Sequence, residues 1–196
     1  MPPADDPFAR LAAEARACTA CAPHLPHAPR PVLKGSSSAR LLIVGQAPGR
    51  RVHETGIPWN DPSGQRLRAW LGLSPQTFYD ESRVAIVPMG LCYPGTQGRA
   101  DAPPRPECAP LWQARARAAL PNLDTTLLVG SHAQRFHLHS RSSMTDTVRA
   151  FADLAPTLWP LPHPSWRNNA WLKHHPWFET DLLPALRRHL AQLLTA

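Results

Sequence analysis

Four short apolar segments, spaced along the chain with helical patterns between them, constrain the fold more than any other feature of this sequence. They are Leu41–Val44, Val84–Val87, Thr125–Val129 and Thr157–Leu161. The first is wholly apolar, as expected for a strand covered on both faces. Because the segments alternate with helices, the sequence predicts a parallel sheet in an α/β sandwich. Pro160 interrupts the fourth segment and favours an edge position or a fraying end, since proline cannot donate to a ladder.

Apolar residues that recur on one face predict the helices. An N-terminal helix carries Phe8, Leu11, Ala12 and Ala15, with Asp6 as its cap. The 196 residues are expected to form one domain, residues 1–196, on which the N-terminal helix and a cysteine pair within residues 1–38 pack. The other helices are expected at Ser63–Leu71, about Ala109–Leu120, Ser131–Leu138 and about Trp177–Leu194, where Pro184 falls in the first two turns.

The segments that leave the carboxyl ends of the strands predict a shared ligand site, because open parallel sheets bind ligands at that edge. They read "GQAPGRRVHETGIPWNDPSG", "MGLCYPGTQGR", "GSHAQ" and "PHPSWRNN". In the first, Gly45 and Gly49 allow the backbone to approach a ligand closely, and Gln46 offers an amide. The loop lacks the Walker lysine and the G-x-G-x-x-G pattern, which makes a nucleotide-binding enzyme of another class the weakest interpretation.

Trp59 and Asp61 are the side chains of the first loop with the clearest chemistry. The Trp59 indole is suited to stacking on a flat heterocycle, although a core position explains a tryptophan equally well. Asp61 supplies a carboxylate, or it forms a turn before Pro62. Ser63 is expected to cap the helix that follows.

His163 lies between two prolines after the fourth strand, and their fixed φ angles define where the imidazole points. This arrangement suits a positioned hydrogen-bond donor. Trp166 and Arg167 follow on an exposed loop, and an apolar wedge beside a cation is how some proteins enter and kink a duplex. The alternative is a proline-stiffened connection around a core tryptophan.

The charge balance favours a polyanionic partner. The chain has 21 Lys+Arg against 14 Asp+Glu, a net charge of +7, and only Lys34 and Lys173 are lysines. Nucleic acid is the first candidate and an acidic membrane the second. Codon bias in a high-GC genome explains arginine in place of lysine but does not explain the net charge. No apolar stretch approaches the roughly 20 residues of a membrane span, and the N-terminus lacks an apolar signal core, so we expect a cytoplasmic protein.

Four cysteines indicate a metal site. Cys18 and Cys21 form a C-x2-C pair, and 15 residues separate Cys92 from Cys108. Four thiolates hold a [4Fe–4S] cluster or a zinc ion. Buried thiols without a metal are the alternative, and disulfides are disfavoured in a reducing compartment.

Taken together, these residues resemble the uracil-DNA glycosylase superfamily, in particular its iron–sulfur branch, family 4, from Cys18 to about Asn169. "GQAPG" stands where that branch has Gly-Glu-(Gly/Ala)-Pro-Gly. "TGIPW" with "NDPSG" matches its Thr-Gly-x-Pro-Phe and glycine-ended loop. The "CTAC" pair and the gap from Cys92 to Cys108 fit its cluster ligands, and "HPS" at His163–Ser165 matches its second motif.

The resemblance implies a three-layer α/β/α sandwich around a four-stranded parallel sheet, and removal of uracil or a related deaminated base from DNA. Trp59 matches the aromatic residue that stacks on uracil, and His163 matches the donor to uracil O2. Backbone groups near Gln46 and Ala47 would position base and water, and the cluster would be structural. DNA is the implied partner, and we expect a monomer. The residues expected to contact DNA are Ser165, Trp166 and Arg167, with Arg50 and Arg51 beside the first loop.

Three positions depart from the family motifs. Gln46 replaces an acid, Ala47 stands where other uracil glycosylases carry a water-activating aspartate, and Pro88 stands where the iron–sulfur branch has a uracil-reading asparagine. We therefore predict His163, Asp61 and Gln46 as the catalytic set, with Asp61 positioning water, and Asn60 as a substitute base reader. Glu54 and His53 are second choices for the water. The alternative is a protein that binds DNA or damaged bases without turnover.

Overall fold

A sheet of four parallel strands forms the centre of the computed structural model, which describes residues 5–98 and 100–195. The strand order is β2-β1-β5-β6. The predicted edge position of the strand with Pro160 is confirmed, because among the described residues β6 pairs only with β5. The strands are β1 (Leu41–Val44), β2 (Val84–Ile86), β5 (Thr125–Val129) and β6 (Leu158–Leu161).

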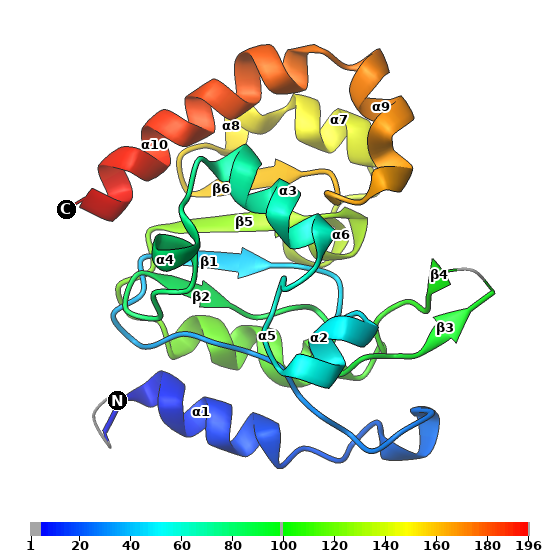
Figure 1. Ribbon diagram of the computed structural model, residues 1–196. Coiled ribbons are helices and arrows are strands. Elements are labelled where there is room, and N and C mark those ends of the chain that lie inside the picture. The colour runs from blue at the N-terminus through cyan, green and yellow to red at the C-terminus, as the bar shows by residue number, and fades with distance from the viewer. Residues whose placement is uncertain (1–4, 99, 196) are drawn as a thin grey trace.

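Helices and one small hairpin complete the fold. The hairpin pairs β3 (Thr96–Gln97) with β4 (Ala100–Asp101) in antiparallel fashion and projects beyond the carboxyl ends of the sheet strands (Figure 1). Short 3-10 turns lie at Ala22–His24 and Trp166–Asn168. The α-helices are α1 (Pro7–Arg16), α2 (Arg50–Thr55), α3 (Pro62–Leu71), α4 (Pro75–Phe78), α5 (Cys108–Ala118), α6 (Ser131–Leu138), α7 (Met144–Arg149), α8 (Phe151–Leu154), α9 (Asn169–His174) and α10 (Leu183–Thr195).

Alternation along the strands divides the core into two layers. Leu42 and Val44 of β1 face a cluster built with α1, α5 and α6, whereas Leu41 and Ile43 face a cluster built with α3, α4, α7 and α10. Both faces of the sheet are therefore covered by helices, and the predicted three-layer α/β sandwich is confirmed.

The N-terminal helix begins as predicted. The Asp6 carboxylate accepts hydrogen bonds from the backbone N–H groups of Phe8 (2.7 Å) and Ala9 (3.2 Å). It also accepts from Ser37 N at 3.1 Å, which ties the helix to the segment before β1. Burial raises the pKa of Asp6, but the backbone donors Ser37, Ala9 and Phe8 outweigh it, and the net shift is downward.

Two predicted helix starts need correction. The cap of α3 is Asp61, whose Oδ1 accepts from Gly64 N at 2.7 Å, and not Ser63. The terminal helix is not continuous from Trp177, because a π-helical turn at Phe178–Leu182 precedes α10. Pro184 has no N–H to donate to the preceding turn, so a regular α-helical ladder cannot run through this point.

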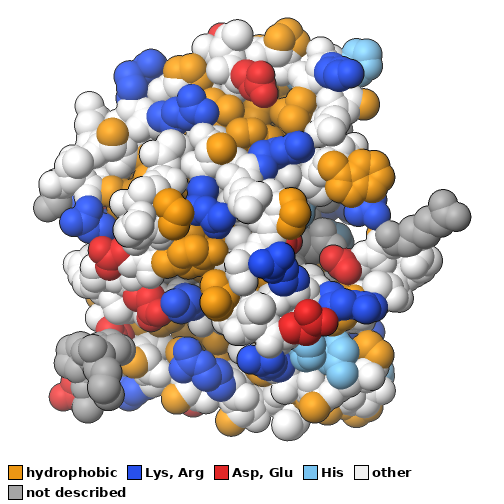
Figure 2. Space-filling model, in the orientation of Figure 1, with side chains coloured by type: hydrophobic (Ala, Val, Ile, Leu, Met, Phe, Trp, Pro, Cys, Tyr) orange, Lys and Arg blue, Asp and Glu red, His pale blue; other side chains and the backbone are white. Residues whose placement is uncertain are grey.

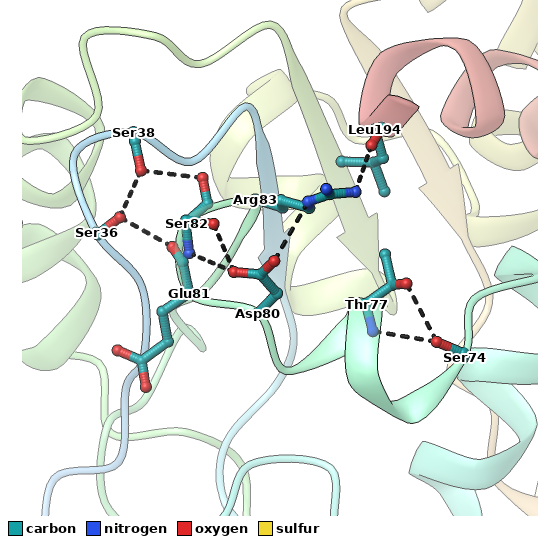
Figure 3. A network of polar contacts seen from close by, with 9 residues as sticks. All are labelled: Ser36, Ser38, Ser74, Thr77, Asp80, Glu81, Ser82, Arg83 and Leu194. Carbon is teal, nitrogen blue, oxygen red and sulfur yellow. Dashed lines mark hydrogen bonds and ion pairs between the residues drawn. The ribbon is translucent and has the colours of Figure 1, made fainter. Parts of the chain in front are cut away.

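Arginines at the amino-end side of the sheet hold the end of α10. Arg83 Nη1 donates to the Leu194 carbonyl at 2.6 Å and its Nε pairs with Asp80 at 3.2 Å (Figure 3). Arg40 Nη1 donates to the Leu193 carbonyl at 3.0 Å. These bonds satisfy carbonyls that a helix terminus leaves unpaired. The polar network of Figure 3 therefore stabilises the fold and lies away from the carboxyl edge.

Candidate functional site

A cavity of about 250 Å³ opens at the carboxyl edge of the sheet. Its walls come from the loop after β1, the segment before α3, the end of β2, strand β4 and the loop after β6. In Figure 2 the carboxyl edge lies at the right of the molecule, where the hairpin projects and basic and acidic side chains are interspersed. The lining includes Gly45–Gly49, Pro58, Trp59, Asp61–Ser63, Ile86, Pro88, Asp101, His163 and Ser165–Arg167.

Trp59 and His163 share this cavity. Their ring centroids are 5.7 Å apart and the rings are tilted by 35°. A Cβ at Gly45 would lie 2.7 Å from Trp59 Cζ2, so a glycine here lets the indole lie against the loop after β1. The two rings are already within contact range, so a base does not fit between them. A ligand that uses both must stack on the indole and direct an edge to the imidazole.

A hydrogen-bonded network holds the Trp59 backbone in a left-handed conformation, with φ 56°. Tyr79 Oη donates to the carbonyls of Pro58 (3.1 Å) and Trp59 (3.3 Å). Arg68 Nη1 donates to the Trp59 carbonyl at 3.2 Å. A Cβ at Gly64 would lie 1.7 Å from that carbonyl oxygen, so α3 packs against Trp59 only with glycine at this position. The Trp59 indole also packs on the core, so a core position and a role in stacking on a ligand are compatible.

The loop that carries His163 is fixed by three side chains. Asn168 Nδ2 donates to the His163 carbonyl at 2.6 Å. Arg66 Nη1 donates to the Ser165 carbonyl at 3.1 Å, and Gln134 Nε2 donates to the Leu161 carbonyl at 2.9 Å, at the end of β6. Arg66 and Arg68 both belong to α3, so this one helix holds the walls that carry the imidazole and the indole.

Burial determines the charge state of His163. It lowers the pKa of the imidazole; Asp61 acts in the opposite direction and Arg167 adds to the lowering. The side chain is therefore neutral at neutral pH, with one ring N–H to donate. A neutral donor beside a carboxylate in a partly apolar cavity suits stabilisation of a leaving group that becomes negative.

The cavity brings together most of the predicted site residues and leaves others outside. Gln46, Ala47, Trp59, Asp61 and His163 line it, as do Pro88, Ser165, Trp166 and Arg167. Asn60 and Arg51 are not part of the lining.

The second choices for positioning water lie elsewhere. His53 and Glu54 line a neighbouring groove with Arg50, and the centroids of the His53 and His27 rings are 4.1 Å apart, with the rings tilted by 34°. Histidines gather beside α2 on the face shown in Figure 2. Arg30 Nη1 donates to the carbonyls of both His53 (2.6 Å) and Glu54 (2.8 Å). These two residues therefore shape the groove next to the cavity.

Trp166 is exposed at the cavity rim. Its relative exposure is 69%, unusual for a large apolar side chain, and the Arg167 guanidinium lies 5.0 Å from its ring. The indole is free to contact a macromolecular ligand, so the expectation of a core tryptophan does not apply to this loop.

Sequence reasoning missed the positioning residues and the hairpin. Arg66, Arg68, Tyr79 and Gln134 act through contacts between segments distant in sequence, and no local pattern signals them. The hairpin had a signal, since Gly98 follows β3 with φ 61° and two-residue turns favour glycine. Helix α2 lies in the segment after β1, for which the sequence predicted only a loop.

A second cavity is lined by all four cysteines, Cys18, Cys21, Cys92 and Cys108, which are free thiols. Cys108 Sγ accepts a hydrogen bond from the Leu91 N–H at 3.2 Å. Burial raises the pKa of Cys108 to about 12 and that of Cys92 to about 11. Within residues 5–98 and 100–195, no three His, Cys, Asp or Glu side chains stand in an arrangement that holds a metal ion. Four soft donors in one cavity are nevertheless the ligand set of an iron–sulfur cluster or zinc.

The fold and the cavity define an α/β protein with a concave, aromatic- and histidine-lined ligand site at the carboxyl edge of its sheet. The family model of the uracil DNA glycosylase superfamily matches residues 33–187, about four fifths of the chain. The chain therefore belongs to this superfamily. The match spans the cavity lining except Val32, and it does not include Cys18 or Cys21. None of the helices in the described part of the chain is long and apolar enough to cross a membrane.

Proposed function

We propose that this protein is a DNA glycosylase that hydrolyses the N-glycosidic bond of uracil or a related deaminated base. The observation that carries the proposal is the shared cavity of Trp59 and His163, with ring centroids 5.7 Å apart, in a member of the uracil DNA glycosylase superfamily. An aromatic face beside a fixed donor suits a planar base swung out of its helix, at a cost of a few kcal/mol.

The proposed chemistry follows from the polar groups of the cavity. When the glycosidic bond breaks, its electron pair stays with the base, which leaves as an anion. The neutral His163 imidazole donates its N–H to the base oxygen, and one pre-aimed donor of this kind is worth about 3–4 kcal/mol in the transition state. Asp61 positions the water with the carboxylate oxygen that does not cap α3. The Gln46 amide, also in the lining, contacts the base.

DNA binding is assigned to the cavity rim. Trp166 and Arg167 stand beside His163, and Arg50 and Arg51 begin α2 on the other side of the first loop. The net charge of +7 supports attraction to phosphates. Binding of this kind weakens steeply as salt rises, because counterions released from DNA contribute to the affinity.

The test is base release from oligonucleotides, single- and double-stranded, that contain uracil, hypoxanthine or xanthine, read out as strand scission after alkali. We expect release from at least one of these and a loss of about 100-fold or more in His163→Ala. His174→Ala, an exposed histidine on α9, is the matched control and should behave as wild type. Absence of scission on every substrate would reject the proposal.

A second candidate, binding without turnover, is favoured by one feature of the cavity. Neither Gln46 nor Ala47 supplies a carboxylate, and Pro88 offers no amide to read a base. This candidate predicts salt-dependent binding to damaged DNA with no base release at stoichiometric protein. The same oligonucleotide panel separates it from the glycosylase.

We further propose that the four cysteines hold a structural [4Fe–4S] cluster, as in the iron–sulfur branch. The four thiols line one cavity, and the N–H of Leu91 already points at Cys108 Sγ. A bound cluster would join the start of the chain to both ends of the segment 92–108. Anaerobically purified protein should be brown and contain iron, and Cys92→Ser together with Cys108→Ser should remove the colour. A colourless preparation with stoichiometric zinc would contradict the cluster.

A further inference from the structure

The hairpin β3–β4 brings a second carboxylate to the candidate active site. Asp101, on β4, lines the same cavity as Trp59 and His163. Among the described residues of this lining, Asp61 and Asp101 are the acidic ones. The hairpin projects beyond the carboxyl edge of the sheet, in the region to which the site belongs (Figure 1).

Asp101 contacts the loop after β1, in which Gln46 and Ala47 supply no carboxylate. Its Oδ2 lies 3.4 Å from the point where a Cβ on Gly49 would be. This places the carboxylate next to Gly49, at the end of a segment in which residues 46 and 47 are Gln and Ala. A carboxylate from a different element therefore lines the same cavity as Gln46 and Ala47, which supply none.

The two aspartates are held differently. Asp61 Oδ1 accepts from Gly64 N at 2.7 Å and caps α3, so one of its oxygens is committed to the fold. Asp101 pairs with Thr96 through the hairpin backbone, and its side chain is exposed at the cavity rim. A base in the interior of the cavity would leave its sugar near the rim, where Asp101 lies.

The charges around Asp101 keep it usable as a base. Partial burial and the Asp61 carboxylate raise its pKa, while Arg167, Arg50 and the Tyr93 hydroxyl lower it, and the net shift is upward. A carboxylate with a raised pKa takes a proton from water more effectively than an ordinary one. Arg167 and Arg50 favour its ionised form.

We propose that Asp101 is the water-activating carboxylate of the glycosylase reaction, an inference that rests on the proposed function. The bond from C1′ to the base nitrogen breaks and its electron pair stays on the base. The water oxygen bonds to C1′, and the proton that it loses passes to the Asp101 carboxylate. Asp61 positions the same water, and solvent later takes the proton from Asp101.

The experiment compares Asp101→Asn, Asp101→Glu and the control Asp153→Asn, an exposed aspartate on α8, with wild type. The substrate is the base found to be released, and the readouts are single-turnover rate, its pH dependence and affinity for an uncleavable analogue of the same DNA. We expect Asp101→Asn to lower the rate by about 100-fold or more. The affinity for the uncleavable analogue should change by less than about threefold, because the proposed role of Asp101 is in the chemical step and not in binding. The wild-type rate should fall with acid, and Asp101→Asn should lose that limb; Asp101→Glu should regain part of the rate.

Three outcomes separate the possible failures. Wild-type protein that releases no base would refute the proposed function, and the role of Asp101 with it. Active wild type with an unaffected Asp101→Asn rate would overturn the Asp101 assignment alone. A fall in rate that is matched by a fall in affinity, or one that Asp101→Glu does not relieve, would also overturn it, since the residue would then act in binding or in folding of the hairpin.

Discussion

Tyr79 is the residue that links the α3–β2 connection to the indole of the site. Its hydroxyl is bonded to the carbonyls of Pro58 and Trp59 at 3.1 and 3.3 Å, and Arg68 Nη1 donates to it at 3.2 Å. Burial raises the pKa of Tyr79, although Arg68 acts against it, so the hydroxyl keeps its proton and its role as donor.

We predict that Tyr79→Phe lowers the free energy of unfolding by about 1–2 kcal/mol, since the Pro58 and Trp59 carbonyls lose a donor. The KM for base release should rise while affinity for undamaged DNA stays unchanged, because the indole wall loosens but the rim does not. Urea unfolding and steady-state kinetics measure the two effects. Unchanged stability and unchanged KM would show that Arg68 and Gly64 suffice to hold Trp59.

Asp61 combines a structural and a proposed chemical role, and two substitutions separate them. Asparagine caps helices about as well as aspartate, whereas alanine costs about 1 kcal/mol. We predict that Asp61→Asn keeps the free energy of unfolding of wild type and that Asp61→Ala loses about that amount, while both lower base release. If Asp61→Asn released base at the wild-type rate, the role of Asp61 would be to cap α3 and not to position water.

At the scale of elements, helix α3 organises the site. Asp61 caps it, Arg66 reaches the Ser165 carbonyl and Arg68 reaches the Trp59 carbonyl. The helix approaches the Trp59 backbone so closely that a Cβ at Gly64 would lie 1.7 Å from the carbonyl oxygen. A shift of α3 therefore moves both walls of the cavity.

We predict that Gly64→Ala destabilises the protein by about 3 kcal/mol, because backbone atoms must move to relieve the overlap. Ser63→Ala, in the same turn, is the control and should cost little, since Ser63 does not cap the helix. Urea unfolding of both variants measures the difference. Equal stability of the two variants would contradict the tight packing of α3 on Trp59.

The same elements show how far sequence reasoning reaches. Strands such as Leu41–Val44 were predictable because both faces of a central parallel strand are buried and the residues are uniformly apolar. The shared site was predictable because the loops at the carboxyl ends of parallel strands meet at one edge of the sheet. Trp59, Asp61 and His163 lie on these loops and were predicted with them. Contacts such as Arg66 to Ser165 span 99 residues and leave no local pattern. The contact of Asp101 with Gly49 depends on how the hairpin is oriented against the first loop, and the glycine at its turn does not signal that orientation.

At the scale of the whole molecule, partly buried histidines couple stability to pH. Burial is the first cause that lowers the pKa of five histidines below the ordinary value of 6.5: His53, His132, His137, His163 and His189. Above that value both folded and unfolded forms are neutral. As the pH falls below it, the unfolded chain binds protons that the folded protein does not, so stability decreases.

We predict that the free energy of unfolding falls by about 2 kcal/mol between about pH 7 and about pH 5.5. Each histidine contributes at most about 1.4 kcal/mol per pH unit, and these histidines contribute less because their side chains are partly exposed. Urea unfolding at the two pH values measures the fall. His137→Gln keeps a partner for Gln113 and removes one titrating group, so its loss should be smaller. Stability that is flat or rises toward acid would contradict this account.

The account as a whole depends on hydrolysis at the cavity shared by Trp59 and His163, and the most direct measurement is a stoichiometric reaction in heavy-oxygen water with a uracil-containing oligonucleotide. Mass spectrometry should find free, unlabelled uracil and abasic DNA that carries one heavy oxygen, and His163→Ala should form neither at a comparable rate. Oligonucleotides with uracil, hypoxanthine or xanthine that all stay intact after prolonged incubation, or release that His163→Ala leaves unchanged, would contradict the claim.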